Sequence, residues 1–108
     1  MGGAETGRDM GELDSVIHQP ARLRIMGALC GLASAEQVDF SFLKKKLALT
    51  DGNLGAHLLT LEEKGYIKVE KTFVGRRPKT FLAVTRQGRR AFDAHVAALQ
   101  AILAAGVR

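Results

Sequence analysis

The chain has 108 residues, a formal net charge of +5 and 46% hydrophobic residues, which fits one globular domain and excludes a disordered chain. Its single cysteine excludes a disulfide framework and a multi-cysteine metal site, and a lone thiol fits a reducing cytoplasm. No apolar run reaches the length of a membrane span. Residues 1–11 lack the apolar core of a signal peptide, so we expect them to be a flexible tail before a single domain over 12–108.

The charge is distributed unevenly along the chain. Residues 1–40 have three basic and six acidic side chains, a net of −3, whereas residues 41–108 have 13 basic and five acidic side chains, a net of +8. A compact segment with this excess is typical of proteins that bind phosphate. The alternative is a solvated cationic face that only maintains solubility.

The first helical pattern is interrupted by a proline. Leu13, Val16 and Ile17 share one face of a short helix, and Pro20 then opens a longer helix that ends near Gly31. Proline is tolerated in the first turn of a helix but not in its interior, which predicts a break at residues 18–20. Residues 31–37 are expected to be a loop, and residues 38–40 a brief strand.

Two further helices follow, joined by a tight turn at residues 48–50. We expect Ser41 to cap a helix over 42–47, with Phe42, Leu43 and Leu47 inward and the three lysines 44–46 mostly outward. Thr50 is the candidate cap of the next helix, which runs to about Lys64 and ends at Gly65.

The helix after Thr50 has two contrasting faces. Leu54, Leu58 and Leu61 recur at helical spacing and form its core stripe. The opposite arc is small and polar, whereas an ordinary solvent face would be rich in Lys and Glu. It contains Gly52, Asn53, Ala56 and Thr60, with His57 at its flank.

A β-hairpin and a last helix complete the chain. Residues 66–73 alternate, with Ile67, Val69 and Phe73 on one side; residues 74–79 are the turn and residues 80–85 the return strand. Thr85 is expected to cap a helix from Arg86 to about Ala105. The element order predicts a mainly α-helical fold with a small β-hairpin, an α+β arrangement. The last helix has an apolar stripe at Phe92, Val96, Leu99 and Leu103, with His95 and Ile102 beside it.

The two helices around residues 48–50 make a helix-turn-helix, whose second helix enters the major groove of double-stranded DNA. Small residues let that helix approach closely, and asparagine can pair with adenine in two-point fashion. The cationic, proline-stiffened hairpin end suits phosphate or a narrow minor groove. Solvation alone is the alternative for each group. The expected DNA contacts are Lys44, Lys45, Thr50, Gly52, Asn53, Ala56, His57, Thr60, Arg76, Arg77 and Lys79.

The segments 18–29, 49–71 and 73–92 resemble the winged helix-turn-helix transcriptional regulators of the MarR and ArsR type, and most closely a compact group of winged-helix DNA-binding regulators. By position, Gly52, Asn53 and Ala56 correspond to the groove-facing residues of that family, and Arg76 and Arg77 to its wing contact. The resemblance implies a homodimer on a near-palindromic site. The paired Cys, His and acidic ligands of metal-sensing ArsR members are missing, so metal sensing is not implied.

The first and last helices carry more apolar surface than one small core needs, which favours dimerisation across a two-fold axis. The alternative is that both stripes fold back on their own chain. The expected dimer contacts are Leu13, Val16, Ile17, Phe92, Val96, Leu99 and Leu103.

No pattern in the chain indicates catalysis or a bound cofactor. Cys30 is expected to be a buried, inert thiol, and the three histidines have no metal-ligand spacing. The sequence therefore predicts a sequence-specific double-stranded-DNA-binding transcriptional regulator, a homodimeric repressor, and not an enzyme. It would act in the cytoplasm, associated with the nucleoid. The alternative is a winged-helix module that docks an acidic protein partner. A small-molecule effector in a pocket between the dimer helices is compatible with the first interpretation, but no residue identifies one.

Overall fold

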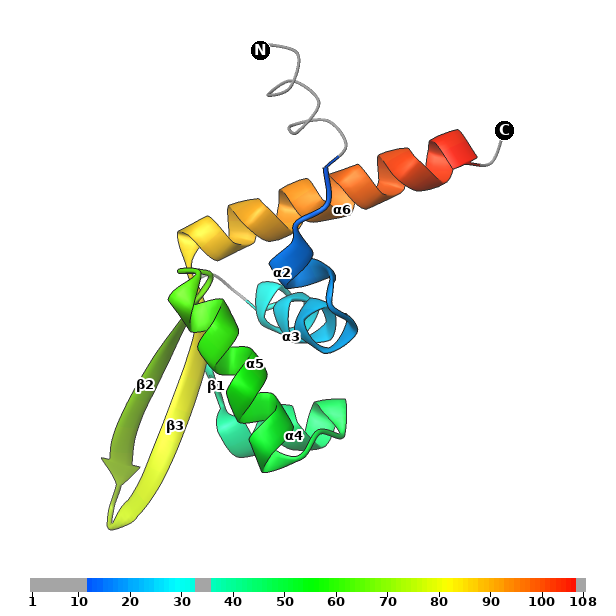
Figure 1. Cartoon of the computed structure of the whole chain (residues 1–108). Helices are drawn as coiled ribbons and strands as arrows, with labels where there is room; N and C mark the ends of the chain where they lie inside the picture. Colours follow the sequence, from blue (N-terminus) through cyan, green and yellow to red (C-terminus); the bar gives the residue numbers. More distant parts are fainter. Residues whose placement is uncertain (1–11, 33–35, 107–108) are drawn as a thin grey trace.

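The computed structural model describes residues 12–32 and 36–106, and it confirms the mainly α-helical fold with a small antiparallel sheet. The expected tail over 1–11 and the middle of the expected 31–37 loop lie outside the described residues. Figure 1 shows the long C-terminal helix across one end of the domain and the β-hairpin extending from the other end. The elements in chain order are α2 (Ser15–His18), α3 (Pro20–Cys30), β1 (Val38–Asp39), α4 (Phe40–Leu47), α5 (Asp51–Glu63), β2 (Ile67–Val74), β3 (Arg77–Val84) and α6 (Arg86–Gly106).

The predicted break before Pro20 is confirmed. Gln19 is extended, Pro20 is the first residue of α3, and the Gln19 side chain accepts a hydrogen bond from the Arg22 N–H at 2.9 Å. Asp14 caps α2 by accepting from the N–H groups of Val16 and Ile17. Each of the two helices therefore has its own side-chain cap. Pro20 stands at the first helical position, where its missing N–H leaves no helix hydrogen bond unmade.

The sheet has the strand order β1-β3-β2, and both strand pairs are antiparallel. The hairpin ladder runs from Ile67 opposite Val84 to Val74 opposite Arg77, so only Gly75 and Arg76 form the turn. Gly75 has φ +66° and Arg76 does not have a positive φ, a pattern that fits a type II′ turn. The turn is thus shorter than the predicted 74–79 segment, and Arg77 already belongs to a strand.

The core lies between the helices and one face of the sheet. Its fully buried side chains are Ile17, Ile25, Met26, Leu29, Leu43, Leu54, Leu61, Leu82 and His95. The predicted core stripe of α5 is confirmed, since Leu58 is also buried.

The start of α4 differs from its prediction. Asp39 caps this helix rather than Ser41, because the extended backbone at the end of β1 lets its carboxylate accept the Phe42 N–H at 2.7 Å. The buried stripe then follows Phe40, Leu43 and Leu47 at helical spacing. Phe42 falls outside this stripe and is 54% exposed, so the expectation that it points inward is wrong.

Phe73 also differs from its prediction as an inward residue, since it is 69% exposed. Strand alternation does place it on the side of Ile67 and Val69. The hairpin, however, continues past the helices that cover that side (Figure 1), and every residue from 70 to 78 is exposed.

The residues that the last helix buries within the single chain lie beside its apolar stripe, which the sequence assigns to a dimer contact. Thr85 caps it as expected, accepting the Gly88 N–H at 2.9 Å, but its buried residues are Gly88, His95 and Ala98. Small residues and one hydrogen-bonded histidine allow α6 to lie close to the other helices. Leu103 is 60% exposed and Ile102 44% exposed, on the part of the helix that extends past α2 in Figure 1.

Candidate nucleic-acid interface

The turn between α4 and α5 is fixed by three contacts. Ala48 adopts the left-handed conformation at φ 55°, and the Leu49 N–H donates to the Lys44 carbonyl at 3.1 Å. Arg24 Nη2 donates to the Leu47 carbonyl at 2.9 Å, which satisfies the end of α4. Thr50 then opens α5, as predicted, by accepting the Asn53 N–H at 3.1 Å.

The N-terminal half of α5 presents a low, open surface. Gly52, Asn53 and Ala56 are all exposed, and a Cβ atom added at Gly52 would meet nothing within 4 Å. Among the elements that the structure describes, none covers the Gly52 backbone or the Asn53 amide. This face has the small relief that a helix needs to enter the major groove of DNA.

Two residues of the predicted DNA face are already engaged inside the chain. His57 is half-buried, and its Nδ1 accepts a hydrogen bond from Arg22 Nη1 at 3.1 Å. Burial lowers the pKa of His57, and the positive charge of Arg22 lowers it further, so the ring is neutral at pH 7. Thr60 donates its hydroxyl proton to the Ala56 carbonyl at 3.2 Å. His57 therefore fixes the position of α5, and the Thr60 hydroxyl is bonded within its own helix.

The lysines of α4 are not equivalent. Lys44 Nζ lies 2.9 Å from the Asp51 carboxylate in the first turn of α5, with side-chain exposures of 41% and 75%. Lys45 and Lys46 are exposed, and neither forms an ion pair with any residue of 12–32 or 36–106. Lys44 thus shares its charge with Asp51, and the two following lysines are the freer cations.

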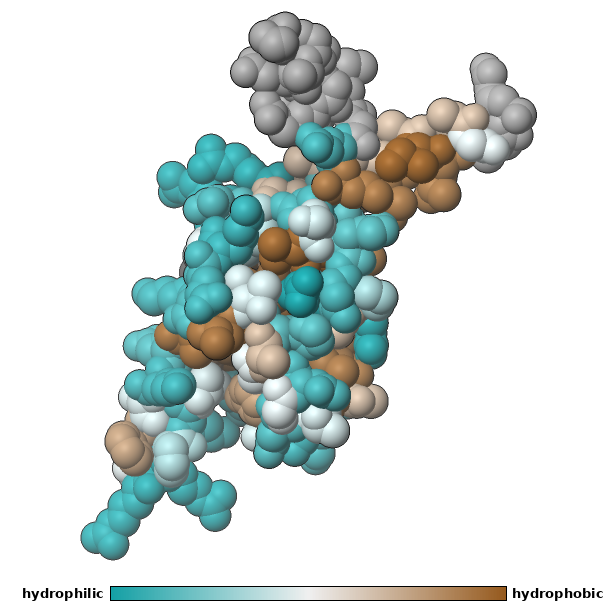
Figure 2. Space-filling view, viewed as in Figure 1, coloured by the Kyte–Doolittle hydropathy of each residue, from teal (hydrophilic) through white to brown (hydrophobic). Residues whose placement is uncertain are grey.

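Of the three cations predicted at the hairpin end, two are unpaired among the described residues and one forms an ion pair. Arg76 lies in the turn and Arg77 at the start of β3; both are exposed and, among the described residues, unpaired. Lys79 points back toward the body, and its Nζ is 2.9 Å from Asp39. In Figure 2 hydrophilic side chains extend from this end of the molecule. The tip thus has two free guanidinium groups, and Lys79 ties the base of the wing to α4.

A model of the winged helix DNA-binding domain family matches residues 22–103. The chain belongs to this family. The wing of the family is the β2–β3 hairpin, and its helix-turn-helix is formed by α4 and α5. The expected resemblance to winged-helix regulators is confirmed, whereas its assignment to the MarR or ArsR type stays a prediction.

One relative and two solved structures are similar to this chain. An uncharacterized protein of Methanocaldococcus jannaschii is 40% identical over 81 residues, which cover 75% of this chain and 85% of that protein. The structure of a transcriptional regulator homologue from Pyrococcus horikoshii OT3 matches with a TM-score of 0.76 and 30% identity, covering 85% of this chain and 88% of that chain. The YtfH protein of Salmonella typhimurium shares the fold, with a TM-score of 0.65 and 20% identity over 98% of this chain and 91% of that chain.

Several arginines of this winged-helix domain satisfy backbone carbonyl groups inside the fold. Arg22 Nε donates to the Val16 carbonyl at 2.6 Å, and Arg89 donates to the carbonyls of Cys30 and Leu32 at 3.0 and 2.8 Å. These cations contribute to the sequence charge but are held by the fold. Lys71 of β2, which is not among the predicted DNA contacts, is exposed beside the wing tip. The charge excess of the sequence does not show which cations are bonded inside the fold and which, like Lys71, are exposed.

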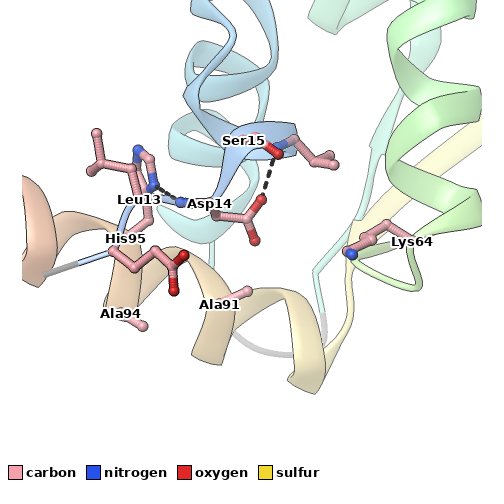
Figure 3. A pocket seen from close by; sticks show the side chains of 9 residues that line it. Leu13, Asp14, Ser15, Lys64, Ala91, Ala94 and His95 are labelled. Atoms are coloured by element: carbon pink, nitrogen blue, oxygen red, sulfur yellow. Dashed lines mark hydrogen bonds between the residues drawn. The ribbon is translucent and has the colours of Figure 1, made fainter. Parts of the chain in front are cut away.

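A hollow of about 330 Å³ lies between the start of the described chain and α6 (Figure 3). His95 Nδ1 accepts the Asp14 N–H at 3.0 Å, and His95 Nε2 lies 3.3 Å from His18 Nδ1. The Tyr66 hydroxyl donates to the Asp14 carboxylate. Within the described part of the chain, no cluster of His, Cys, Asp or Glu side chains is suited to a metal ion. Sequence patterns do not reveal this network, since His18 and His95 are 77 positions apart.

The network shifts the pKa of each buried group. Burial would raise the pKa of Asp14, but the Tyr66 hydroxyl and the N–H groups of Ile17 and Val16 together lower it. Burial and the Asp14 carboxylate raise the pKa of Tyr66. Burial, with His18 as a second cause, lowers the pKa of His95. At neutral pH the site therefore consists of an ionised Asp14, a neutral Tyr66 and a neutral His95.

None of the helices over 12–32 and 36–106 is both long and apolar enough to span a membrane. Cys30 is half-buried, and burial raises the pKa of its thiol, which keeps it protonated at neutral pH.

Proposed function

We propose that this winged-helix domain is a sequence-specific regulator of transcription that binds double-stranded DNA as a homodimer and represses by occupying a promoter. The observation that carries the proposal is the exposed Gly52–Asn53–Ala56 face of α5 beside a hairpin whose tip has two unpaired arginines. A flat helix face and a cationic wing are complementary to a groove and to the phosphates next to it.

The contacts divide into two kinds. The Asn53 amide stands near the N-terminus of α5, where it can read a base edge, and the helix dipole favours nearby phosphate. Arg76, Arg77, Lys45 and Lys46 supply charge that is independent of sequence. The affinity is then mostly electrostatic, and the choice of site comes from the start of α5.

The homodimer is supported by the end of α6. Leu103 is 60% exposed and Ile102 44% exposed in the single chain, and Ala101, Ala104 and Ala105 beside them are exposed as well. A second copy would cover this apolar surface and place two α5 helices about 34 Å apart, one turn of DNA. Ile17 has no exposed surface left for a partner, so its expected place in a dimer interface is corrected to a core position. Val16 and Phe92 pack partly against their own core.

Selection of bound duplexes from a random pool, repeated at two salt concentrations, tests the proposal. We expect a near-palindromic site with half-sites one helical turn apart, and an affinity that falls steeply with salt. A pool that stays random, with no duplex binding in dilute buffer, would sink the proposal. Salt-resistant binding to an acidic protein in place of DNA would instead favour the protein-docking alternative.

Sedimentation at high micromolar concentration tests the dimer. Leu103→Asp should give a monomer and weaken DNA binding together, because it places a charge in the proposed interface. Gln100→Asp is the matched control, since it adds a charge at an exposed position of the same helix. A wild-type monomer, or a Leu103→Asp variant that remains dimeric, would show that the end of α6 is not the interface.

A further inference from the structure

The wing tip exposes apolar side chains that folding does not explain. Phe73 is 69% exposed and Val74 is 54% exposed, and Phe73 is the most exposed of the large hydrophobic side chains in the described chain. They form the last two rungs of the hairpin, opposite Pro78 and Arg77. Hairpin ends in soluble proteins are usually polar, so an apolar end next to two arginines indicates a partner surface.

The apolar residues of the tip are divided between the two sides of the ribbon. Because side chains alternate along a strand, Phe73 and Pro78 share a side with Lys71 and Thr80, whereas Val74 and Arg77 lie on the other. Lys71 and Thr80 line a hollow of about 320 Å³ together with Gly55 and Leu59 of α5. The side of the ribbon that carries Phe73 therefore faces the space beside α5.

The charges at the tip identify the partner. Arg76 and Arg77 follow Val74 within three positions and have no acidic partner in the described part of the chain, and Lys71 precedes Phe73 by two. Glu70, the nearest carboxylate in sequence, is on the opposite side of the ribbon from Phe73. Cations thus precede and follow the apolar residues Phe73 and Val74 in the hairpin. This arrangement is complementary to a polyanion with an apolar interior, such as DNA, in which stacked bases lie between two phosphate backbones.

We propose that Phe73, supported by Pro78, inserts against a base step in the minor groove beside the half-site and bends the duplex, while Arg76 and Arg77 hold the flanking phosphates. This inference rests on the proposed function and extends it to DNA shape. The minor groove is about 6 Å wide, which admits side chains from a two-residue turn but not the body of the domain. Apolar wedges at such steps unstack the bases and bend DNA by about 20–90°.

Insertion of Phe73 as a wedge predicts a preference for certain base steps that does not depend on hydrogen bonds to the bases. Pyrimidine–purine steps such as TA and CA/TG are the easiest to unstack. One such step should therefore occur at a fixed distance from the bases that α5 reads. Replacing it by a stiff A-tract should weaken binding of the wild-type protein, although the bases facing α5 are unchanged.

The test measures bending and affinity on one selected duplex that carries fluorophores at both ends. The Phe73→Ala variant should lose most of the bend and bind about tenfold more weakly, with an unchanged salt slope because no charge is removed. Phe42→Ala is the matched control, since Phe42 is a phenylalanine of comparable exposure, 54%, that belongs to α4 and not to the wing. It should bend and bind DNA as the wild type does. Both variants should retain the wild-type melting temperature.

The outcomes separate the wedge from the proposed function. If the wild type selects a site but leaves it straight, or if Phe73→Ala binds and bends as the wild type does, the wedge is wrong and DNA recognition stands. If the wild type selects no duplex at all, the proposed function fails first. Vesicles of phosphatidylserine and phosphatidylcholine form the third arm. Binding to them that Phe73→Ala abolishes, with DNA binding unchanged, would assign the tip to a lipid surface and overturn the wedge.

Discussion

Asp39 accepts the Phe42 N–H with one carboxylate oxygen at 2.7 Å and the Lys79 ammonium with the other at 2.9 Å. One side chain thus caps the first helix of the helix-turn-helix and holds the base of the wing. The Phe42 N–H, and after it Lys79, lower the pKa of Asp39. The backbone pairing of Asp39 with Phe81 connects the same two elements, so the wing and α4 are joined at this residue.

The two halves of this contact should differ in energy. Asp39→Ala removes a helix cap and should lower the free energy of unfolding by about 1 kcal/mol. Lys79→Ala removes only a partly exposed ion pair and should cost less than about 1 kcal/mol. Urea unfolding of both variants checks the order. A Lys79→Ala variant that is the less stable of the two would contradict the assignment of Asp39 as mainly a cap.

Asp51 places a negative charge at the N-terminus of the proposed recognition helix and pairs with Lys44. Asp51→Asn should free Lys44 for phosphate, so we expect DNA affinity to rise several-fold and the salt slope to steepen by up to about one. Stability should fall by about 0.3–1 kcal/mol, because the carboxylate also favours the helix dipole.

Glu63→Gln provides the control for Asp51→Asn. It makes the same charge change at the other end of α5, at a residue that is also exposed. If both variants tighten DNA binding equally, the effect comes from net charge, and the Lys44–Asp51 pair has no specific part in binding.

Short-range patterns in the sequence were enough for most elements of this fold. Pro20 marked the helix break, Thr50 and Thr85 marked two helix starts, and the leucine spacing of α5 gave its buried face. Each of these signals depends on neighbours within a few residues. The caps at Thr50 and Thr85 are confirmed by hydrogen bonds to Asn53 and Gly88.

The misplaced residues depend on contacts between distant segments. Phe73 follows the strand alternation correctly, but the sequence does not say where the covering helices end. His95 is buried, and the Asp14 N–H that its ring accepts comes from 81 positions away in the sequence. Likewise, Lys79 and Arg76 look alike in the sequence, and only the fold brings Asp39 to one of them. The candidate site could therefore be placed on the right elements, while the free cations could not be told from the paired ones.

Gly88 is where α6 meets the chain after α5. A Cβ atom added there would lie 2.0 Å from the Tyr66 carbonyl oxygen, and that atom is backbone that a rotamer change cannot move. Gly88→Ala should therefore destabilise the domain by about 3 kcal/mol or more, or prevent folding.

Gly55→Ala is the matched control for Gly88→Ala. Gly55 also lies inside a helix, but a Cβ atom there would meet nothing within 4 Å, so helix propensity predicts a gain of up to about 1 kcal/mol. Thermal unfolding of the two variants checks the prediction. Equal melting temperatures would mean that the start of α6 does not fit tightly against Tyr66.

The proposed division between base and phosphate contacts gives two different mutant behaviours. Arg76→Ala should weaken binding to every duplex and reduce the salt slope by about one, because one phosphate contact is lost. Asn53→Ala should relax the preference at one base pair, at a cost of about 1–3 kcal/mol on the best site, and leave the slope unchanged. Binding isotherms at several salt concentrations, on the selected site and on a scrambled one, make the comparison. Identical behaviour of the two variants would mean that the contacts are not divided in this way.

The buried network around His95 predicts a dependence of stability on pH. His95 Nδ1 accepts the Asp14 N–H, so the ring proton lies on Nε2, which faces His18, and a second proton would remove the acceptor. The groups facing the ring are Asp14 and His18, and burial lowers the pKa of His95 in the folded state. The unfolded chain therefore binds more protons below its own histidine pKa of about 6.5.

The contribution of the neutral His95 to the free energy of unfolding should therefore be complete above about pH 6.5. It should decrease as the pH falls below that value, by at most about 1.4 kcal/mol per pH unit for each proton. His57, whose pKa is also lowered, adds to the same window, whereas the lowered pKa of Asp14 acts only below its usual value of 3.8. His95→Gln keeps an acceptor for the Asp14 N–H and removes the titration, so its unfolding free energy should change less between pH 7 and pH 5 than that of the wild type. His57→Gln should remove the other part of the slope. Urea titrations at both pH values measure these unfolding free energies. A His95→Gln variant with the wild-type dependence on pH would show that His95 is not the group that titrates.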